Sequence, residues 1–586
     1  MAVENLITEH IDVWTSVVKT RSTSGRGSSK KLELYGVKKL RELILELAVR
    51  GKLVPQDPND EPASVLLERI AAEKAQLVKE KKIKRSKALP LVSTDEQPFQ
   101  LPNGWAWERI GTFGVVGTGA TPSRAKPEYW EPAEFNWVSS GETSELFVSA
   151  TKERISGLAL EETNVSIYPK GTLIVAMYGQ GKTRGQITEL LDSAGTNQAC
   201  AAIQLVELSQ GHRSYVKLFF RKAYLDLRSQ SAGGAQPNLN VGKISNTVIP
   251  VPPLPEQHRI VAKVDELMAL CDQLEQQTES SIEAHQVLVT TLLDTLTNSA
   301  DADELMQNWA RISEHFDTLF TTEESIDQLK QAILQLAVMG KLVPQDPSDE
   351  PATELLKRIA EEKAQLVKEK RIKKQKALPP ISEDEKPFEL PNGWEWCRIQ
   401  DVALFTTSGS RDWAKYYSDS GALFVTMGNL SRGSYELRLD NLRFVRPPKG
   451  GEGSRTKLEA RDLLISITGD VGNLGLIPEE FGEAYINQHT CLLRFMPECQ
   501  GKYFPDFMRS PLAKYQFDAP QRGIKNSFRL SDVGEMHVPL PPLNEQVRIT
   551  EKVSDFLSIC ECLKVRLRES QITRLHLTDA IVDLVV

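Results

Sequence analysis

The chain has 586 residues, of which 40% are hydrophobic and 26% charged, and its formal net charge at pH 7 is −8. Length and composition indicate a globular protein of several domains, and the charge excludes a uniformly basic surface, so any contact with nucleic acid is expected to be local or shared with a partner. No run of 18 apolar residues occurs, and no basic segment followed by an apolar one stands near the N-terminus. Neither a membrane span nor a secretory signal is therefore expected, and the predicted location is the cytoplasm. The seven cysteines form no CxxC pair, which fits reduced thiols and no structural zinc site.

Ahead of the first repeated segment, residues 6–18 are expected to form a helix, and a basic, Ser- and Gly-rich stretch follows at 21–31. Segment 301–328 takes the same place in the second half of the chain without that stretch. Two further basic runs, 79–87 and 368–376, repeat one another. They are compatible with phosphate contacts, with a solvated helix end or with a partner contact, and the sequence leaves these roles open.

The chain is a tandem duplication. Residues 40–110 and 329–399 are identical at 51 of 71 positions with an offset of 289, and the same offset relates PLPEQHRI, ending at Ile260, to PLNEQVRI, ending at Ile549. Each copy therefore consists of a near-identical helical segment, a divergent globule and a long helix. We expect an N-terminal helical scaffold at 1–104, a first globule at 105–255 and a central region at 256–393 that opens with the long helix 256–298. A second globule at 394–544 and a C-terminal helix at 545–586 follow.

The two long helices carry apolar residues at alternating spacings of three and four after Pro-rich stops. Such a seam predicts that the helices pack on each other as a rod of roughly 60 Å, and the alternative is that each packs only on its own globule.

Each globule is predicted to be a mixed α/β unit, because strand-like runs at 172–177, 422–427 and 462–468 are separated by Gly-rich polar loops. Gly179 and Gly469 follow such runs, and an Asn-Gln pair lies 18 residues later in each copy. The loops between these landmarks differ completely. We expect an α+β protein whose globules meet different targets while the duplicated scaffold meets the same partner twice.

One stretch, Ala176 to Thr183 (AMYGQGKT), fits a relaxed phosphate-binding loop after an apolar strand. Its first glycine is replaced by alanine, the following RGQITELLDSAG gives at best a short helix, and the second copy has SITGDVGNLGL here. A P-loop ATPase is therefore kept only as an alternative, beside a coiled-coil adaptor without DNA contact. Methyltransferase loops, nuclease carboxylate clusters and paired histidines are not evident, so we expect no catalytic residue and no cofactor or metal bound by this chain.

Side chains that read base edges are frequent on glycine-flanked loops of both globules. The candidates in the first globule are Thr121, Ser123, Arg124, Gln180, Lys182, Thr183, Arg184, Gln236 and Asn238. The candidates in the second are Ser410, Arg411, Lys415, Asn429, Arg432, Arg522, Lys525, Asn526 and Arg529. Trp130, Trp137 and Trp413 are expected in the core rather than stacked on bases.

These features resemble the specificity subunits of type I restriction-modification systems, and among them the type IB, EcoA-like branch. The resemblance covers essentially the whole chain. It is carried by RELILELAVRGKLVPQDPNDEPA with its second copy, the LPNGW…W frame, the TPSR…YW…WV segment, and PLPEQ and PLNEQ followed by long helices.

The resemblance implies that each globule is a target recognition domain that reads one half of a bipartite, asymmetric site in double-stranded DNA. It implies that the long helices form an antiparallel pair, related by a pseudo-twofold, that separates the domains and fixes the gap between the half-sites. Two methylation subunits and two restriction subunits are the implied partners. They supply S-adenosylmethionine binding, adenine methylation, and ATP- and Mg²⁺-dependent translocation and cleavage, and the chain itself is then a non-catalytic subunit of a defence against foreign DNA.

Overall fold

The computed structural model describes residues 7–21, 31–85, 87–179, 183–229, 239–411, 413–448, 450, 453–518 and 528–585. The chain divides into two compact units: unit 1 comprises Met1–Ser281 and Gln571–Val586, and unit 2 comprises Ile282–Ser570. Ser281 and Ser570 are separated by the repeat offset of 289. The two units are thus equivalent halves of the duplication, each completed by the end of the other copy's long helix.

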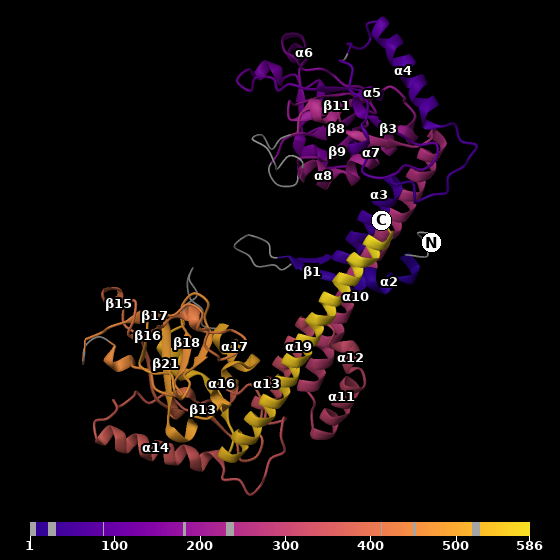
Figure 1. Cartoon of the computed structure of the whole chain (residues 1–586). Helices are drawn as coiled ribbons and strands as arrows, with labels where there is room; N and C mark the ends of the chain where they lie inside the picture. Colours follow the sequence, from indigo (N-terminus) through magenta and orange to yellow (C-terminus); the bar gives the residue numbers. More distant parts are fainter. Residues whose placement is uncertain are drawn as a thin grey trace. The chain divides into compact units, whose positions relative to one another are not determined.

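Unit 1 contains a five-stranded sheet in the order β4-β11-β8-β9-β6, a three-stranded sheet β10-β5-β7, and the ribbons β12-β3 and β1-β2. Figure 1 labels the neighbouring strands β11, β8 and β9 of the five-stranded sheet. Its strands are β1 (Val18–Arg21), β2 (Lys31–Leu34), β3 (Ala106–Arg109), β4 (Gly114–Thr118), β5 (Phe135–Val138), β6 (Phe147–Val148), β7 (Glu153–Ile155), β8 (Leu173–Ala176), β9 (Ile187–Leu190), β10 (Ala194–Thr196), β11 (Cys200–Leu205) and β12 (Val248–Val251). Its helices are α2 (Ile11–Ser16), α3 (Tyr35–Val49), α4 (Ala63–Lys79), α5 (Ile110–Phe113), α6 (Gly157–Glu162), α7 (Gln210–Lys222), α8 (Tyr224–Ser229), α9 (Val241–Ser245) and the first part of α10 (Leu254–Thr297).

Unit 2 contains two four-stranded sheets, β14-β21-β18-β19 and β15-β17-β16-β20, and the ribbon β13-β22. Its strands are β13 (Glu395–Arg398), β14 (Ala403–Ser408), β15 (Tyr417–Ser418), β16 (Ala422–Val425), β17 (Arg443–Val445), β18 (Leu463–Ser466), β19 (Leu474–Leu476), β20 (Ala484–Ile486), β21 (Thr490–Phe495) and β22 (His537–Leu540). Its helices are α11 (Ala302–Glu314), α12 (Phe316–Leu319), α13 (Glu323–Val338), α14 (Ala352–Lys368), α15 (Ile399–Val402), α16 (Tyr503–Met508), α17 (Pro511–Asp518), α18 (Leu530–Glu535) and most of α19 (Leu543–Val585).

Each unit has its own four-stranded core sheet, and the two sheets have the same strand order: β4-β11-β8-β9 in unit 1 corresponds to β14-β21-β18-β19 in unit 2. All four residues of β8 and of β18 are buried. Strands buried on both faces read as continuous apolar runs, which is why these two were visible in the sequence. The expected α+β class, with two sheet-containing globules and long helices, is confirmed, and Trp137 and Trp413 lie in the cores at 2% exposure.

The repeated GKLVPQDP motif ends a helix. After α3, Gly51 adopts a left-handed φ of 69°, and the N–H of Lys52 bonds to the carbonyl of Leu47 at 3.0 Å. This is the usual way to close the last turn, and it favours glycine because other residues pay a steric cost at positive φ. Gly340, with a φ of 69°, ends α13 in the same way.

A buried carboxylate joins the repeated segment to the start of each long helix. Glu256, 1% exposed, accepts hydrogen bonds from Trp105 Nε1 at 3.0 Å and from Gln56 Nε2 at 3.3 Å. Arg259, one turn later, pairs with Asp60 at 2.6 Å. Burial raises the pKa of Glu256, and the two donors partly offset that rise. The second copy repeats these contacts with Glu545, Trp394, Gln345, Arg548 and Asp349.

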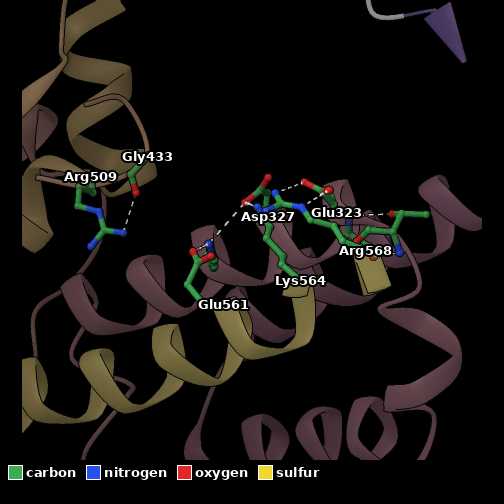
Figure 2. Close-up of polar contacts among 10 residues, drawn as sticks. Glu323, Asp327, Gly433, Arg509, Glu561, Lys564 and Arg568 are labelled. Atoms are coloured by element: carbon green, nitrogen blue, oxygen red, sulfur yellow. Dashed lines mark hydrogen bonds and ion pairs between the residues drawn. The ribbon is translucent and has the colours of Figure 1, made fainter. Parts of the chain in front are cut away.

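Ion pairs fix each long helix to the repeat helix of its own copy. In unit 1, Arg41 of α3 pairs with Asp272 and Glu275 of α10 at 2.7 and 2.6 Å. Three ion pairs join α13 to α19 in unit 2: Lys330–Glu561, Asp327–Lys564 and Glu323–Arg568. Figure 2 labels the last two pairs. The alternative in which each long helix packs only on its own globule is wrong, since its end contacts the repeat helix of the other copy. Tyr35 donates to Asp579 at 2.9 Å, and Gln328 donates to Thr290 at 3.1 Å.

The N-terminal segments of the copies differ. Where one helix over 6–18 was expected, α2 covers Ile11–Ser16 and the chain then enters the β1-β2 ribbon. The second copy has α11 and α12 in this place. Most of the basic stretch 21–31 lies outside the described residues. Within the described ranges, no helix combines the length and the apolar run that a membrane crossing requires.

Candidate nucleic-acid interface

The candidate loops of each globule open at one edge of the core sheet. In unit 1, β11 runs antiparallel to both neighbours, and its first residues pair with the last residues of β4 and β8: Ala201 with Thr118, and Cys200 with Ala176. The loops after β4 and β8 and the turn before β11 therefore lie together. We call this place the loop edge, formed in unit 1 by residues 119–126, 177–179, 183–186 and 197–199.

The loop edge of unit 2 has the same construction. Cys491 of β21 pairs with Ser408 at the end of β14, and Thr490 pairs with Ser466 at the end of β18. Its loop edge comprises residues 409–411, 413–416, 467–473 and 487–489. The antiparallel sheet thus brings the described candidates at 121–124 of unit 1 close to those at 183–184, although the two groups are far apart along the chain.

After β4, Thr121 Oγ1 donates to Gln198 Oε1 at 2.5 Å. The exposed Arg124 stacks over the Trp130 ring at 4.6 Å and forms two hydrogen bonds, 2.7 and 2.9 Å, with Glu153. These bonds lower the pKa of the Glu153 carboxyl. Ser123 uses its carbonyl to accept from Trp130 Nε1 at 3.3 Å. Arg124 would have to exchange Glu153 for an acceptor on DNA.

The stretch that matched a phosphate-binding loop is a strand-to-strand connection. It leaves β8 at Ala176 and enters β9, which pairs antiparallel with β8, Val175 opposite Ile187. A P-loop leads into a helix whose N-terminus holds the phosphates, so the geometry contradicts that alternative, and the short helix allowed for RGQITELLDSAG is instead β9. Thr183 and Arg184 are half-buried in this connection, whereas Gln180 and Lys182 lie outside the described residues.

In unit 2, Ser410 bridges to Asn487, and Arg411 and Lys415 are exposed on the same loop. Arg432 joins this edge from the segment after β16 and pairs with Asp470 at 3.1 Å. Arg529 is exposed at the start of α18, one residue beyond Phe528, whose N–H bonds to the carbonyl of Ile467 at the edge. Arg522, Lys525 and Asn526 lie outside the described residues, as do Gln236 and Asn238 in unit 1.

One candidate has a structural role. Asn429 is 4% exposed; its Oδ1 accepts from the Thr426 N–H at 3.0 Å, and its Nδ2 donates to the Arg438 carbonyl at 2.9 Å. Ser139 and Glu142 form the equivalent turn in unit 1. Because both amide atoms of Asn429 are engaged in holding this loop, we leave it out of the proposed contacts.

The opposite edge of each core sheet is tied to the repeated helix α4 or α14. Lys74 donates to the carbonyls of Gly111 and Gly114 at 2.6 and 2.9 Å, where β4 begins. Burial lowers the pKa of Lys74. Lys363 does the same for unit 2, donating to Gln400 at 2.6 Å. The basic runs 79–87 and 368–376 follow these lysines, so each starts from the end of the sheet away from its loop edge.

Comparisons with known proteins agree with this geometry. The model of the type I restriction modification DNA specificity domain matches residues 102–284 and 391–570. The chain is 42% identical over 600 residues to the type I restriction enzyme EcoAI specificity subunit of Escherichia coli, covering 100% of this chain and 99% of that protein. The chain belongs to the type I restriction-modification specificity subunits. The EcoEI specificity subunit of Escherichia coli is 41% identical over 616 residues, with 100% and 99% covered.

The solved HsdS subunit from Thermoanaerobacter tengcongensis aligns with 83% of this chain and 98% of its own at 17% identity, with a TM-score of 0.42, which is too low to add to the assignment. The expected resemblance is confirmed by the family model and the two full-length relatives. As a specificity subunit the chain serves DNA recognition and is not itself an enzyme. Neither the ATPase nor the adaptor alternative is supported.

Proposed function

We propose that the loop edge of each unit reads one half of a bipartite, asymmetric site in double-stranded DNA. The observation that carries this is the contrast between the edges: one sheet order in both units presents two different sets of donors. Major-groove base edges are read by such amide, hydroxyl and guanidinium groups. The proposed contacts are the candidates at the loop edges together with the remaining candidates of each globule: Thr121, Ser123, Arg124, Gln180, Lys182, Thr183, Arg184, Gln236, Asn238, Ser410, Arg411, Lys415, Arg432, Arg522, Lys525, Asn526 and Arg529.

The duplicated frame is proposed to seat one methylation subunit per copy, with two restriction subunits completing the complex. In support, EKAQLVKEK is identical at 73–81 and 362–370, and its side chains are exposed or half-buried. The backbone at Lys81 and Lys370 is left-handed, with φ values of 60° and 57°, a conformation that costs non-glycine residues energy. Intramolecular bonds of Lys74 and Lys363 account for only part of this identity. A partner contact therefore explains the basic runs better than a contact with the target site.

The partners are proposed to bring S-adenosylmethionine, ATP and Mg²⁺ and to carry out adenine methylation and cleavage in the cytoplasm. We propose that α10 and α19, of 44 and 43 residues, set the gap between the half-sites as an antiparallel pair. At a rise of 1.5 Å per residue each is about 65 Å long, which is sufficient for a site of roughly 15 base pairs at 3.4 Å per step.

The test is a globule exchange in the complete complex. Residues 105–255 are replaced by the matching segment of the EcoAI specificity subunit, and methylated adenines are mapped across a genome. One half of the target is expected to change while the other half and the gap remain. An exchange that leaves the methylated sequence unaltered contradicts the proposal and favours an adaptor role for the chain.

A further inference from the structure

The turn before the last core strand is the same in both loop edges although its surroundings are not. Residues 196–205 (TNQACAAIQL) and 486–495 (INQHTCLLRF) occupy equivalent places, since Cys200 and Thr490 begin β11 and β21. Only the Asn and the Gln are identical among these ten positions. A side chain kept at two edges that otherwise have only glycines in common serves something that both edges share.

The asparagine of each pair is explained by the fold. Asn197 Oδ1 accepts from the Ala199 N–H at 3.1 Å, and the Asn197 carbonyl accepts from the Cys200 N–H at 3.2 Å. Asn487 makes the same side-chain bond to the His489 N–H at 3.1 Å. Asparagine is favoured where a side chain must hold its own turn in this way.

The glutamine has no such role. As the second residue of the turn, Gln198 is exposed and Gln488 half-buried, and their amides meet different neighbours. Gln198 uses Oε1 to accept from Thr121, and Gln488 uses one Nε2 hydrogen to donate to His489 Nε2 at 2.8 Å. His489 is itself held by Thr468, 2.8 Å from its Nδ1. Because an amide nitrogen carries two hydrogens, each glutamine keeps at least one N–H that no described residue accepts.

We propose that Gln198 and Gln488 each donate this N–H to a phosphate oxygen of the DNA backbone. The two contacts then place each half-site in the same position relative to its loop edge. The inference rests on the proposed function of the loop edges. A phosphate is the acceptor that two half-sites of different sequence have in common, and such contacts fix register without reading bases. Thr121 in one unit and the Thr468–His489 pair in the other hold the amides in place before DNA binds.

The experiment uses the complete complex and duplex oligonucleotides that carry its mapped target or single-base variants of it. Gln488→Ala and Gln198→Ala are each expected to weaken binding about tenfold on every duplex, the size of a hydrogen bond to a charged group, so that the preference for target over variants is unchanged. Gln488→Glu, which puts a carboxylate against the phosphate, is expected to bind still more weakly. Gln210→Ala, an exposed glutamine at the start of α7 beyond the far end of β11, is the matched control and is expected to bind as the parent does.

Unchanged binding by both alanine variants overturns the inference, and so does a loss confined to the target, because that pattern identifies base reading. Melting temperature and subunit content of each complex are measured alongside. Failure to retain the methylation subunits would assign the glutamines to a partner contact instead and would also overturn the inference. The globule exchange reports separately on the proposed function. If the exchange alters the target while the glutamine variants bind normally, only the phosphate contact is wrong.

Discussion

Unit 1 and unit 2 have the same contacts between the repeated segment and the long helix, but different contacts at their loop edges. The bond from Trp105 to Glu256 and the bond from Trp394 to Glu545 are both 3.0 Å long. At the loop edges, by contrast, Arg124 is held by Glu153 after β4, whereas Arg432 is held by Asp470 from a different segment. Buried contacts that a duplicated frame needs twice have been kept, while solvent-exposed loops on the same sheet have changed freely.

The ion pairs between the repeat helices and the long helices are only partly the same in the two units. Arg41–Asp272 and Lys330–Glu561 are equivalent pairs with the same polarity. At the neighbouring positions the polarity is reversed, since Lys38 and Glu275 of the first copy correspond to Asp327 and Lys564 of the second. The reversal disfavours pairing of the repeat helix of one copy with the first half of the other copy's long helix, because like charges would then face each other.

The strongest test of the shared frame removes its buried carboxylates. Glu256→Ala and Glu545→Ala each leave a buried tryptophan N–H without its acceptor and remove one of the acceptors of a glutamine amide. Each is therefore expected to lower the free energy of unfolding of its unit by about 2–4 kcal/mol. Chemical denaturation of the full chain measures this. Glu→Gln variants at the same positions keep one acceptor oxygen and should lose less. Clearly unequal losses in the two units would contradict the equivalence of the frames.

The stability of unit 2 is expected to depend on pH through a buried carboxyl that unit 1 lacks at the equivalent position. Asp506 in α16 is 5% exposed, and burial raises its pKa to about 6, which Arg509 at 3.2 Å only partly offsets. Leu218 of α7 holds the equivalent place in unit 1, because Tyr215 and Tyr503, three residues earlier, bond to the carbonyls of Pro250 and Pro539.

A carboxyl whose pKa is higher in the folded than in the unfolded state stabilises the fold below the unfolded pKa, near 3.8, and that stability is lost as the pH rises through about 6. Asp506→Leu is therefore expected to gain about 3 kcal/mol relative to the parent between pH 4 and pH 7. Unfolding of both proteins across this range measures the difference. A gap that stays constant with pH would show that Asp506 does not titrate as burial requires.

The difference between loop edges predicts losses confined to one half-site. Arg411→Ala is expected to reduce discrimination by about 10- to 100-fold at positions in the half-site read by unit 2, the usual size of an arginine–base contact. Arg124→Ala should act only on the other half-site, and less strongly because Arg124 gives up Glu153 to bind. Methylation protection on half-site variants distinguishes the two. Equal losses at both halves from either variant would argue against separate readers.

The smallest expected effect concerns the reversed charges. Asp327→Lys places two lysines together and should destabilise unit 2 by about 1 kcal/mol, and adding Lys564→Asp should restore most of it, as in a double-mutant cycle. Thermal unfolding of the single and double variants provides the readout. If the double variant is no more stable than Asp327→Lys alone, the ion pair between residues 327 and 564 does not determine which long helix the repeat helix binds.

Much of the fold could be predicted from the sequence because the repeat, the Pro-rich stops and the apolar strands are local signals. The helix starts at Leu254 and Leu543 lie within two residues of those expected. The strand β9 was missed, since ITEL becomes a strand only by pairing with β8. The exchange of helix ends between the units was also missed, because contacts such as Tyr35–Asp579 join residues 544 positions apart.

The candidate interface was predicted in its composition but not in its arrangement. Asn429 carries an amide on a glycine-flanked loop, and only the fold shows that both atoms of this amide are hydrogen-bonded within a capping turn. Gln198 and Gln488 were visible as landmarks, yet their role depended on knowing that the turn places them beside the ends of β4 and β18. The identity of two residues in otherwise divergent loops was the signal available.

The most direct test of two separate reading heads is to map methylated adenines in cells whose complex contains a chain with residues 105–255 also in place of 394–544. Both segments have 151 residues, so the frame is preserved. Two copies of the same head should give a target in which both halves carry one sequence in inverted order across an unchanged gap. A target that keeps the original second half would contradict the account.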